Sequence, residues 1–153
     1  MTNPDGSHPD VNIYECFDYN QKIFEMNGDN QMWCNICNKL QDSLYGSTLY
    51  SGAKYLIINL NRGRGAVYGC NVIFPDDLNI FNYLTYKHGP TYYELFAVIS
   101  HLGPSSMGGH FIAYCKNRID NQWYLYNDAW VTLCKEPKQY LKGMPYILFY
   151  RKK

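Results

Sequence analysis

Apolar runs separated by polar turns dominate the second half of the chain. Stretches rich in β-branched and aromatic residues, bounded by glycine and polar residues, are typical of strands. By this pattern we expect strands at residues 93–101, 109–116, 122–127 and 146–150. Short turns join the first three, so the sequence predicts an antiparallel meander.

The pattern in the remaining chain is weaker. The run Tyr-Leu-Ile-Ile-Asn-Leu at 55–60 predicts a strand buried on both faces. The other expected elements are short: a helix within 11–24, a turn at 27–31, a strand at 72–75, an extended segment at 78–84 and a helix at 136–141. Together these elements predict a β-rich domain of the α+β class.

Composition narrows the possible functions. The chain has 153 residues, a length typical of one domain. Its formal charge of +1 gives no overall electrostatic attraction to nucleic acid or an anionic membrane. No apolar stretch approaches the roughly 20 residues of a membrane helix. Residues 1–10 contain two prolines, a glycine and no apolar run, so we expect a disordered leader there and one domain at 11–153.

Six cysteines occur at scattered spacings without a secretory signal. They are expected to remain thiols or to bind metal in a reducing, intracellular compartment, cytoplasmic or nuclear. Cys34 and Cys37 form a Cys-x-x-Cys pair that could supply two of the four ligands of a structural zinc. The alternative is a β-turn with two unligated thiols. Upstream, only His8 and Cys16 could contribute further ligands.

His110 stands where a glycine-rich segment leads into a predicted strand. An imidazole in a cleft can take a proton from a thiol and return it to a leaving amine. Asn127 or Asp128, at the end of the neighbouring strand, could orient the ring, and Gly108 and Gly109 would let a peptide backbone pass closely. Spacing alone favours a plainer interpretation, with a glycine hairpin turn and an ordinary strand histidine.

Three separated blocks resemble the histidine box of ubiquitin-specific proteases. They are Tyr-Glu-Leu-Phe-Ala-Val-Ile-Ser-His at 93–101, Gly-Gly-His-Phe-Ile-Ala-Tyr at 108–114 and Trp-Tyr-Leu-Tyr-Asn-Asp at 123–128. Residues 56–62, 72–75 and 145–151 are similar to further strands of that family. The resemblance covers about residues 11 to 151 and is far more specific than a lone Gly-Gly-His.

The resemblance implies a papain-like domain, with the palm sheet and part of the fingers in this chain. It implies that His110 is the general base, Asn127 the residue that orients it and Asp128 a supporting acid. The partners implied are ubiquitin and ubiquitinated proteins. Four further residues would flank the channel for the Gly-Gly tail of ubiquitin: Tyr93, His101, Gly108 and Gly109.

The family's nucleophile lies in a box of the type Gly-Asn-Thr-Cys, and no such string occurs here. We therefore expect the thumb and its cysteine to lie in a part of the catalytic domain outside this chain, which alone would be inactive. Cys115 is a poor substitute, because it would point away from His110 on the same strand. The family's second cysteine pair, upstream in the fingers, would complete a zinc site with Cys34 and Cys37. The resemblance also implies that catalysis needs no cofactor.

Two other functions remain open. A family member without its cysteine could bind ubiquitin as an inactive scaffold. A zinc-ribbon-like interaction domain would depend on Cys34 and Cys37, with the Gly-Gly-His segment as a plain turn. For an incomplete domain we also expect low stability or self-association through uncovered surface.

Overall fold

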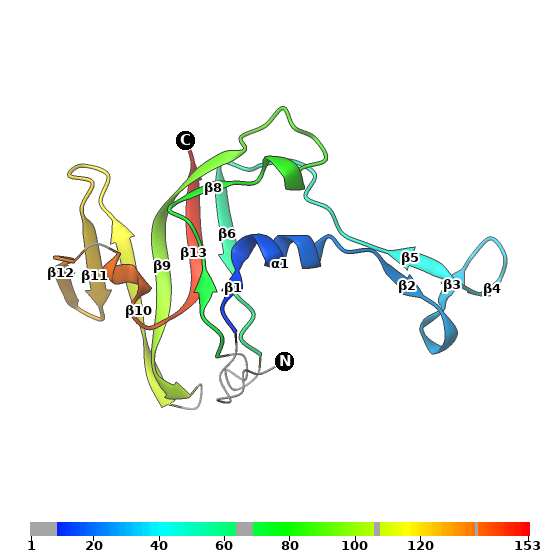
Figure 1. The fold of residues 1–153 in the computed structure, drawn as a ribbon, viewed down its shortest axis with the longest axis horizontal. Helices are drawn as coiled ribbons and strands as arrows, with labels where there is room; N and C mark the ends of the chain where they lie inside the picture. Colours follow the sequence, from blue (N-terminus) through cyan, green and yellow to red (C-terminus); the bar gives the residue numbers. More distant parts are fainter. Residues whose placement is uncertain (1–8, 64–68, 106–107, 137) are drawn as a thin grey trace.

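One large antiparallel sheet forms the body of the chain (Figure 1). The computed structural model describes residues 9–63, 69–105, 108–136 and 138–153. The strand order of this main sheet is β12-β11-β10-β9-β13-β6, and β8 pairs with the first residues of β9. The bounds are β6 (Tyr55–Asn59), β8 (Asp77–Asn79), β9 (Tyr92–Ser105), β10 (Gly108–Lys116), β11 (Trp123–Asn127), β12 (Trp130–Leu133) and β13 (Met144–Lys152). The predicted β-rich, antiparallel architecture is confirmed.

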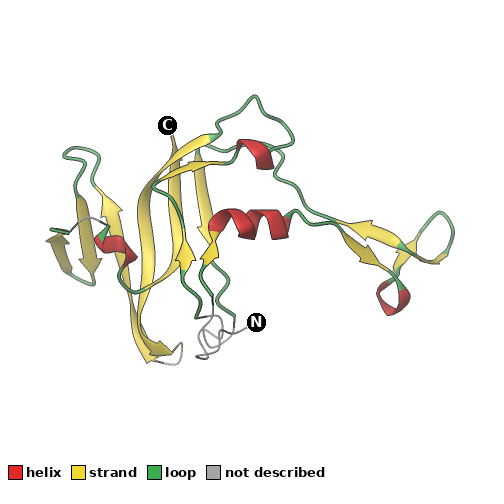
Figure 2. Cartoon of the chain, viewed as in Figure 1, coloured by secondary structure: helices red, strands yellow, loops and turns green. Residues whose placement is uncertain are grey.

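Smaller elements surround the main sheet (Figure 2). Helix α1 (Ile13–Asn20) lies to one side of it, next to β6 in this view, and two hairpin-like pairs project farther away on the same side. The pairs are β2 (Phe24–Met26) with β5 (Ser43–Tyr45), and β3 (Met32–Cys34) with β4 (Lys39–Gln41). β1 (Val11–Asn12) runs parallel to β7 (Val72–Ile73). The 3-10 turns among the described residues are η1 (Gly28–Asn30), η3 (Phe81–Tyr83) and η4 (Gln139–Leu141).

The core lies between α1 and one face of the main sheet. Six sheet residues there are essentially inaccessible to solvent: Leu78, Tyr93, Leu95, Val98, Leu148 and Tyr150. Ile13 of α1 packs into the same cluster. The helix begins with a capping box, in which Asn12 Oδ1 accepts from the Tyr14 N–H at 2.9 Å and Glu15 Oε2 accepts from the Asn12 N–H at 2.7 Å. These bonds satisfy first-turn donors, so this short segment is helical as predicted.

The strand predicted at 55–60 is present as β6, but the prediction that both its faces are buried is wrong. β6 lies at the edge of the main sheet and pairs with β13. Tyr55 is 50% exposed and Ile57 is 62% exposed. Both lie on the side of the sheet opposite the core, here called the outer face, which also carries Phe96 and Phe149. The side chains on both faces of β6 are largely apolar, but only those on the core face are covered by other residues.

β9 contains a bulge that changes which residues point inward. Leu95 and Val98 both face the core, although two residues three positions apart would point to opposite faces of an unbroken strand. Two successive residues of β13 pair with Ala97 and Leu95, which leaves Phe96 as an extra residue. The bulge thus keeps both halves of this 14-residue strand on the core.

Other predictions differ from the structure in extent. The helix expected at 136–141 is only the 3-10 turn η4, because Lys138 adopts a left-handed conformation with φ of 55°. The glycine-rich segment is mostly strand, since β9 continues to Ser105 and β10 begins at Gly108. β12, after a two-residue turn, was not predicted. The expected leader at 1–10 lies largely outside the described residues.

Within the described ranges, no helix has the length and apolar character needed to cross a membrane.

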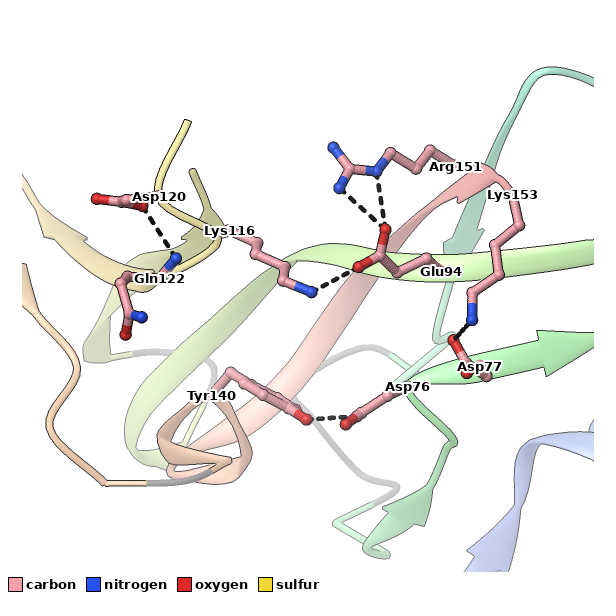
Figure 3. Close-up of polar contacts among 9 residues, drawn as sticks. All are labelled: Asp76, Asp77, Glu94, Lys116, Asp120, Gln122, Tyr140, Arg151 and Lys153. Atoms are coloured by element: carbon pink, nitrogen blue, oxygen red, sulfur yellow. Dashed lines mark hydrogen bonds and ion pairs between the residues drawn. The ribbon is translucent and has the colours of Figure 1, made fainter. Parts of the chain in front are cut away.

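Glu94 joins β9 to two neighbouring strands on the outer face (Figure 3). Its Oε1 accepts from Lys116 Nζ at 2.5 Å, and its Oε2 accepts from Arg151 Nε and Nη2 at 3.1 and 2.9 Å. The hydrogen bond from Lys116 is the main cause that lowers the pKa of Glu94 below its ordinary value of 4.5; partial burial opposes it and Arg151 adds to it. The charged carboxylate therefore stabilises the fold above that ordinary value.

We expect Glu94→Gln to lower the free energy of unfolding by about 1 kcal/mol at neutral pH, because the charge-assisted contacts are weakened at a partly buried site. Since the folded-state pKa is depressed, this difference from the wild type should be full above the ordinary value of 4.5 and should fade as the pH falls through the lower folded-state pKa. Urea titrations across that range measure the effect. Glu136→Gln, which removes an exposed ion pair with Lys142, is the control and should change little at any pH.

Candidate active site

His110 lies at the start of β10 with its side chain on the same side as the core residue Ile112. It pairs with Leu102 of β9. On the other flank of β10, Tyr126 of β11 pairs with Ala113, so the next residue, Asn127, falls beside Ile112 and on the His110 side. The pairing of two strands therefore brings these two side chains together.

The contact between the two side chains selects one tautomer of the neutral imidazole. His110 Nε2 lies 2.6 Å from Asn127 Oδ1. An amide oxygen can only accept a hydrogen bond, so Nε2 carries a proton in this contact, and in the neutral ring Nδ1 then presents a lone pair. The side chain of His110 is 42% exposed, which leaves the ring accessible. The arrangement can take a proton at Nδ1 while Asn127 holds the ring from behind.

Asp128 lies next to this pair at the tip of the β11–β12 turn. Its Oδ2 is 3.7 Å from His110 Nε2, its side chain is 78% exposed, and its backbone has φ of 50°. At that distance and exposure, a carboxylate gives weak attraction to an imidazolium and no direct hydrogen bond. Asp128 therefore stands as a peripheral charge.

Gly109 and His101 pack directly against each other. A Cβ atom built on Gly109 would lie 2.2 Å from His101 Nε2 and 2.6 Å from the Leu102 carbonyl oxygen. His101 is 5% exposed, and its ring lies 4.9 Å from the Phe111 ring and 5.8 Å from the Tyr146 ring, measured between centroids. Strand alternation puts it on the opposite face from His110. His101 thus contacts the backbone beside His110 rather than His110 itself.

Of the other predicted channel residues, Gly108 is near the site and Tyr93 is not. Gly108 begins β10, and no described heavy atom lies within 4 Å of a Cβ built on it. Tyr93 is fully buried near the other end of β9, where its hydroxyl donates to the Ala53 carbonyl at 2.7 Å. The structure does not bring Tyr93 to His110, and its role there is in the core.

The cysteines do not supply a thiol to His110. All six lie in described ranges and none forms a disulfide. Cys115 lies on β10 but on the opposite face from His110, and burial raises the pKa of its thiol. Cys16, Cys70 and Cys134 are partly buried, as expected for small side chains at the edge of a core.

Cys34 and Cys37 lie at the turn between β3 and β4, in the pair of strands farthest from the main sheet (Figure 1). The Asn38 N–H donates to the Cys34 carbonyl at 2.8 Å, which closes the turn. The backbone N–H of Cys37, followed by that of Ile36, lowers the pKa of the Cys34 thiol. Thiolates suit zinc, but no group of three or more potential ligands occurs among the described residues. The pair is half a site, and zinc stays a prediction; His8 lies outside the described residues.

Arg62 has a larger structural role than its sequence position indicated. Its side chain is buried, and its Nε and Nη2 donate to the Pro145 carbonyl at 3.1 and 2.8 Å, while Nη1 donates to the Cys70 carbonyl at 2.5 Å. These bonds tie the segment after β6 to the start of β13. A hollow of about 340 Å³ lies beside them, bordered also by His101 and Gly103. A buried arginine is detectable only from the fold, since sequence favours an exposed one.

The chain is similar to known proteins over most of its length. Residues 7–150 match the family model described as ubiquitin carboxyl-terminal hydrolase. Human ubiquitin carboxyl-terminal hydrolase 17 is 35% identical over 133 residues, which cover 84% of this chain and 25% of the relative. Human inactive ubiquitin carboxyl-terminal hydrolase 17-like protein 4 matches with the same identity and coverage. The chain spans about a quarter of the length of these relatives.

Solved structures give the same result. A chain of the SAGA DUB module, containing Ubp8, Sgf11, Sus1 and Sgf73 and bound to monoubiquitin, is 30% identical with a TM-score of 0.72. The match covers 95% of this chain and 35% of that one. The corresponding module bound to ubiquitin aldehyde is 28% identical with a TM-score of 0.70, at the same coverage. The fold of this chain thus corresponds to about a third of a larger chain in these modules.

Proposed function

The chain belongs to the ubiquitin carboxyl-terminal hydrolase family, and from this premise we propose that it is the histidine-bearing part of a thiol-dependent deubiquitinase. The observation that carries the proposal is the contact of 2.6 Å between His110 Nε2 and Asn127 Oδ1. It prepares Nδ1 to accept a proton, which is what a general base for a cysteine nucleophile requires. The proposed substrate is a protein joined to the C-terminal glycine of ubiquitin.

The proposed reaction uses a cysteine from a part of the catalytic domain outside this chain. His110 Nδ1 accepts the thiol proton, and the thiolate attacks the carbonyl carbon of the terminal glycine of ubiquitin. The oxyanion intermediate collapses to a thioester as the departing amine takes the proton from the imidazolium. Water, deprotonated by His110, then hydrolyses the thioester and frees the thiol. Backbone or side-chain donors near the cysteine would stabilise the oxyanion.

Asn127 and the glycines have positioning roles in this proposal. Asn127 holds the ring in the tautomer that leaves Nδ1 free, and Asp128 adds weak attraction once the ring is charged. Gly108 and Gly109 keep the strand beside His110 free of side chains, which suits the Gly-Gly tail of ubiquitin. The fit between Gly109 and His101 supports His101 as a residue that holds this strand in place.

The test combines this chain with the cysteine-bearing part of the same catalytic domain. Each part alone and the mixture are incubated with ubiquitin that carries a C-terminal electrophile, and adducts are measured by mass spectrometry. We expect an adduct on the cysteine-bearing part, formed at least about 100-fold faster in the mixture than with that part alone. A mixture that reacts no faster, or an adduct on this chain alone, would contradict the proposal.

A second function, an inactive ubiquitin-binding scaffold, is favoured by one specific observation. A relative named as inactive matches this chain with the same identity and coverage as a relative whose name carries no such word. For a scaffold, this chain would bind ubiquitin, and the reconstituted mixture would give no adduct. The same experiment therefore separates the two functions.

A further inference from the structure

A hollow of about 410 Å³ lies on the outer face, at the end of the main sheet away from His110. Lys116, at the far end of β10, borders it, and six residues of extended strand place this edge on the order of 20 Å from His110. The hollow is therefore separate from the candidate active site, and none of the proposed catalytic residues lines it.

Positive charge gathers around this hollow. Five of the chain's 14 Lys and Arg residues line it: Lys54, Lys116, Arg118, Arg151 and Lys152. Glu94 neutralises part of this charge, since it binds both Lys116 and Arg151 (Figure 3). Lys54, Arg118 and Lys152 form no ion pair with any residue that the structure describes. Five cations against one carboxylate leave four positive charges here, although the whole chain has a formal charge of only +1.

Aromatic side chains form the apolar part of the same hollow. Tyr55 and Phe96 line it, with ring centroids 6.0 Å apart, and Lys54 and Arg151 lie over their faces at 5.6 and 5.8 Å. A second hollow of about 380 Å³ continues from these rings past Ile57. A ligand seated here would contact both cations and an apolar floor.

The spread of the cations indicates the shape of the ligand. Lys54 precedes β6, Lys116 ends β10, and Arg151 lies on β13, so the charges extend over the four neighbouring strands β6, β13, β9 and β10. At the usual spacing between strands this distance is about 14 Å. A single phosphate group needs donors that converge on one point, whereas an extended peptide places alternate side chains about 7 Å apart. Several carboxylates on one peptide match the pattern.

We propose that this hollow is a docking site for an acidic peptide segment of a partner protein, one with several Asp or Glu residues around an aromatic residue. The carboxylates would bind the unpaired cations, and the aromatic ring would pack on Tyr55 and Phe96. The site would recruit a substrate or regulator by a segment other than ubiquitin. This inference is independent of the proposed deubiquitinase activity, because it uses no residue of the candidate active site.

The test measures binding of a fluorescein-labelled peptide, Asp-Glu-Asp-Phe-Glu-Asp-Glu, to the 153-residue chain by fluorescence anisotropy. We expect binding that weakens with salt, and at least a tenfold loss of affinity, about 1.4 kcal/mol, in the double variant R118E and K152E. Both residues are exposed, so the variant should fold, which circular dichroism checks. The control K22E and K39E changes the net charge equally on exposed residues elsewhere and should stay within about twofold of the wild type.

Three results would overturn the proposal. One is no binding at about 1 mM peptide, and another is an equal loss in both double variants, which would indicate general attraction between charges. The third is that replacing the peptide's Phe by Ser leaves affinity unchanged while vesicles of phosphatidylserine and phosphatidylcholine, or inorganic phosphate, bind through Arg118 and Lys152. That result would make the hollow a site for anionic lipid or phosphate instead.

Discussion

Replacing His110 with alanine is expected to lower the rate of adduct formation by at least about 1,000-fold when this chain is combined with the cysteine-bearing part of its catalytic domain. The thiol would lose the group that accepts its proton. With Nε2 bound to Asn127, the ring nitrogen of His110 that is left for this role is Nδ1. The rate is measured with ubiquitin that carries a C-terminal electrophile. Asn127→Ala should have a smaller effect, about 10-fold to 100-fold, because the base remains and only its orientation is lost.

His88→Ala is the matched control for this experiment. His88 is an exposed histidine whose ring packs 4.9 Å from Tyr86, outside the candidate active site. It should react at the wild-type rate. An undiminished rate in His110→Ala, or an equal loss in His88→Ala, would remove His110 from the mechanism.

Gly109→Ala is expected to lower both the stability of the chain and the activity of the reconstituted enzyme. The added Cβ would lie 2.2 Å from His101 Nε2 and 2.6 Å from a backbone carbonyl oxygen, and Gly109 has φ of 156°. Either the ring or the strand must move, and the strand carries His110. We expect a loss of about 2 kcal/mol in the free energy of unfolding, measured by urea titration of this chain, and an adduct rate about 100-fold lower in the reconstituted enzyme.

Gly108→Ala provides the control one residue away. No described heavy atom lies within 4 Å of its added Cβ, so stability should change by less than about 0.5 kcal/mol. Adding His101→Ala to Gly109→Ala should restore only part of the lost stability, since the contact with the carbonyl oxygen remains. Equal effects of the two glycine variants would show that the packing of His101 against Gly109 does not hold the strand.

The strands of the second half of the chain were predictable because their β-prone, apolar composition and the glycine and polar residues at their ends match their place in a buried sheet. Apolar runs bounded by glycine and polar turns gave β9, β10, β11 and β13, and their order gave the antiparallel pairing. The proximity of His110 to Asn127 follows from the same pairing, since adjacent strands with a short connection must lie side by side. The strand order therefore predicts that residues 127 and 128 lie near His110, but not which of the two contacts its ring.

The features of the fold and the site that the sequence did not predict depend on contacts between segments that are distant in the chain. An apolar run does not show which of its faces is covered, so Ile57 was expected inside although it is exposed at the sheet edge. Tyr93 lies in the block that resembles the family, yet its place on β9 puts it far from His110. The contact of His101 with Gly109 and the burial of Arg62 arise only when strands and loops come together.

The bulge at Phe96 makes the length of β9 as important as its composition. One extra residue keeps Leu95 and Val98 on the same face. Deleting it would restore strict alternation, so either the buried tyrosine near one end of the strand or His101 near the other would turn to the wrong side. Evolution can therefore exchange side chains along this strand far more easily than it can shorten it. Gains and losses of residues are expected in the turn at 117–122, where neither the core nor the candidate site depends on the count.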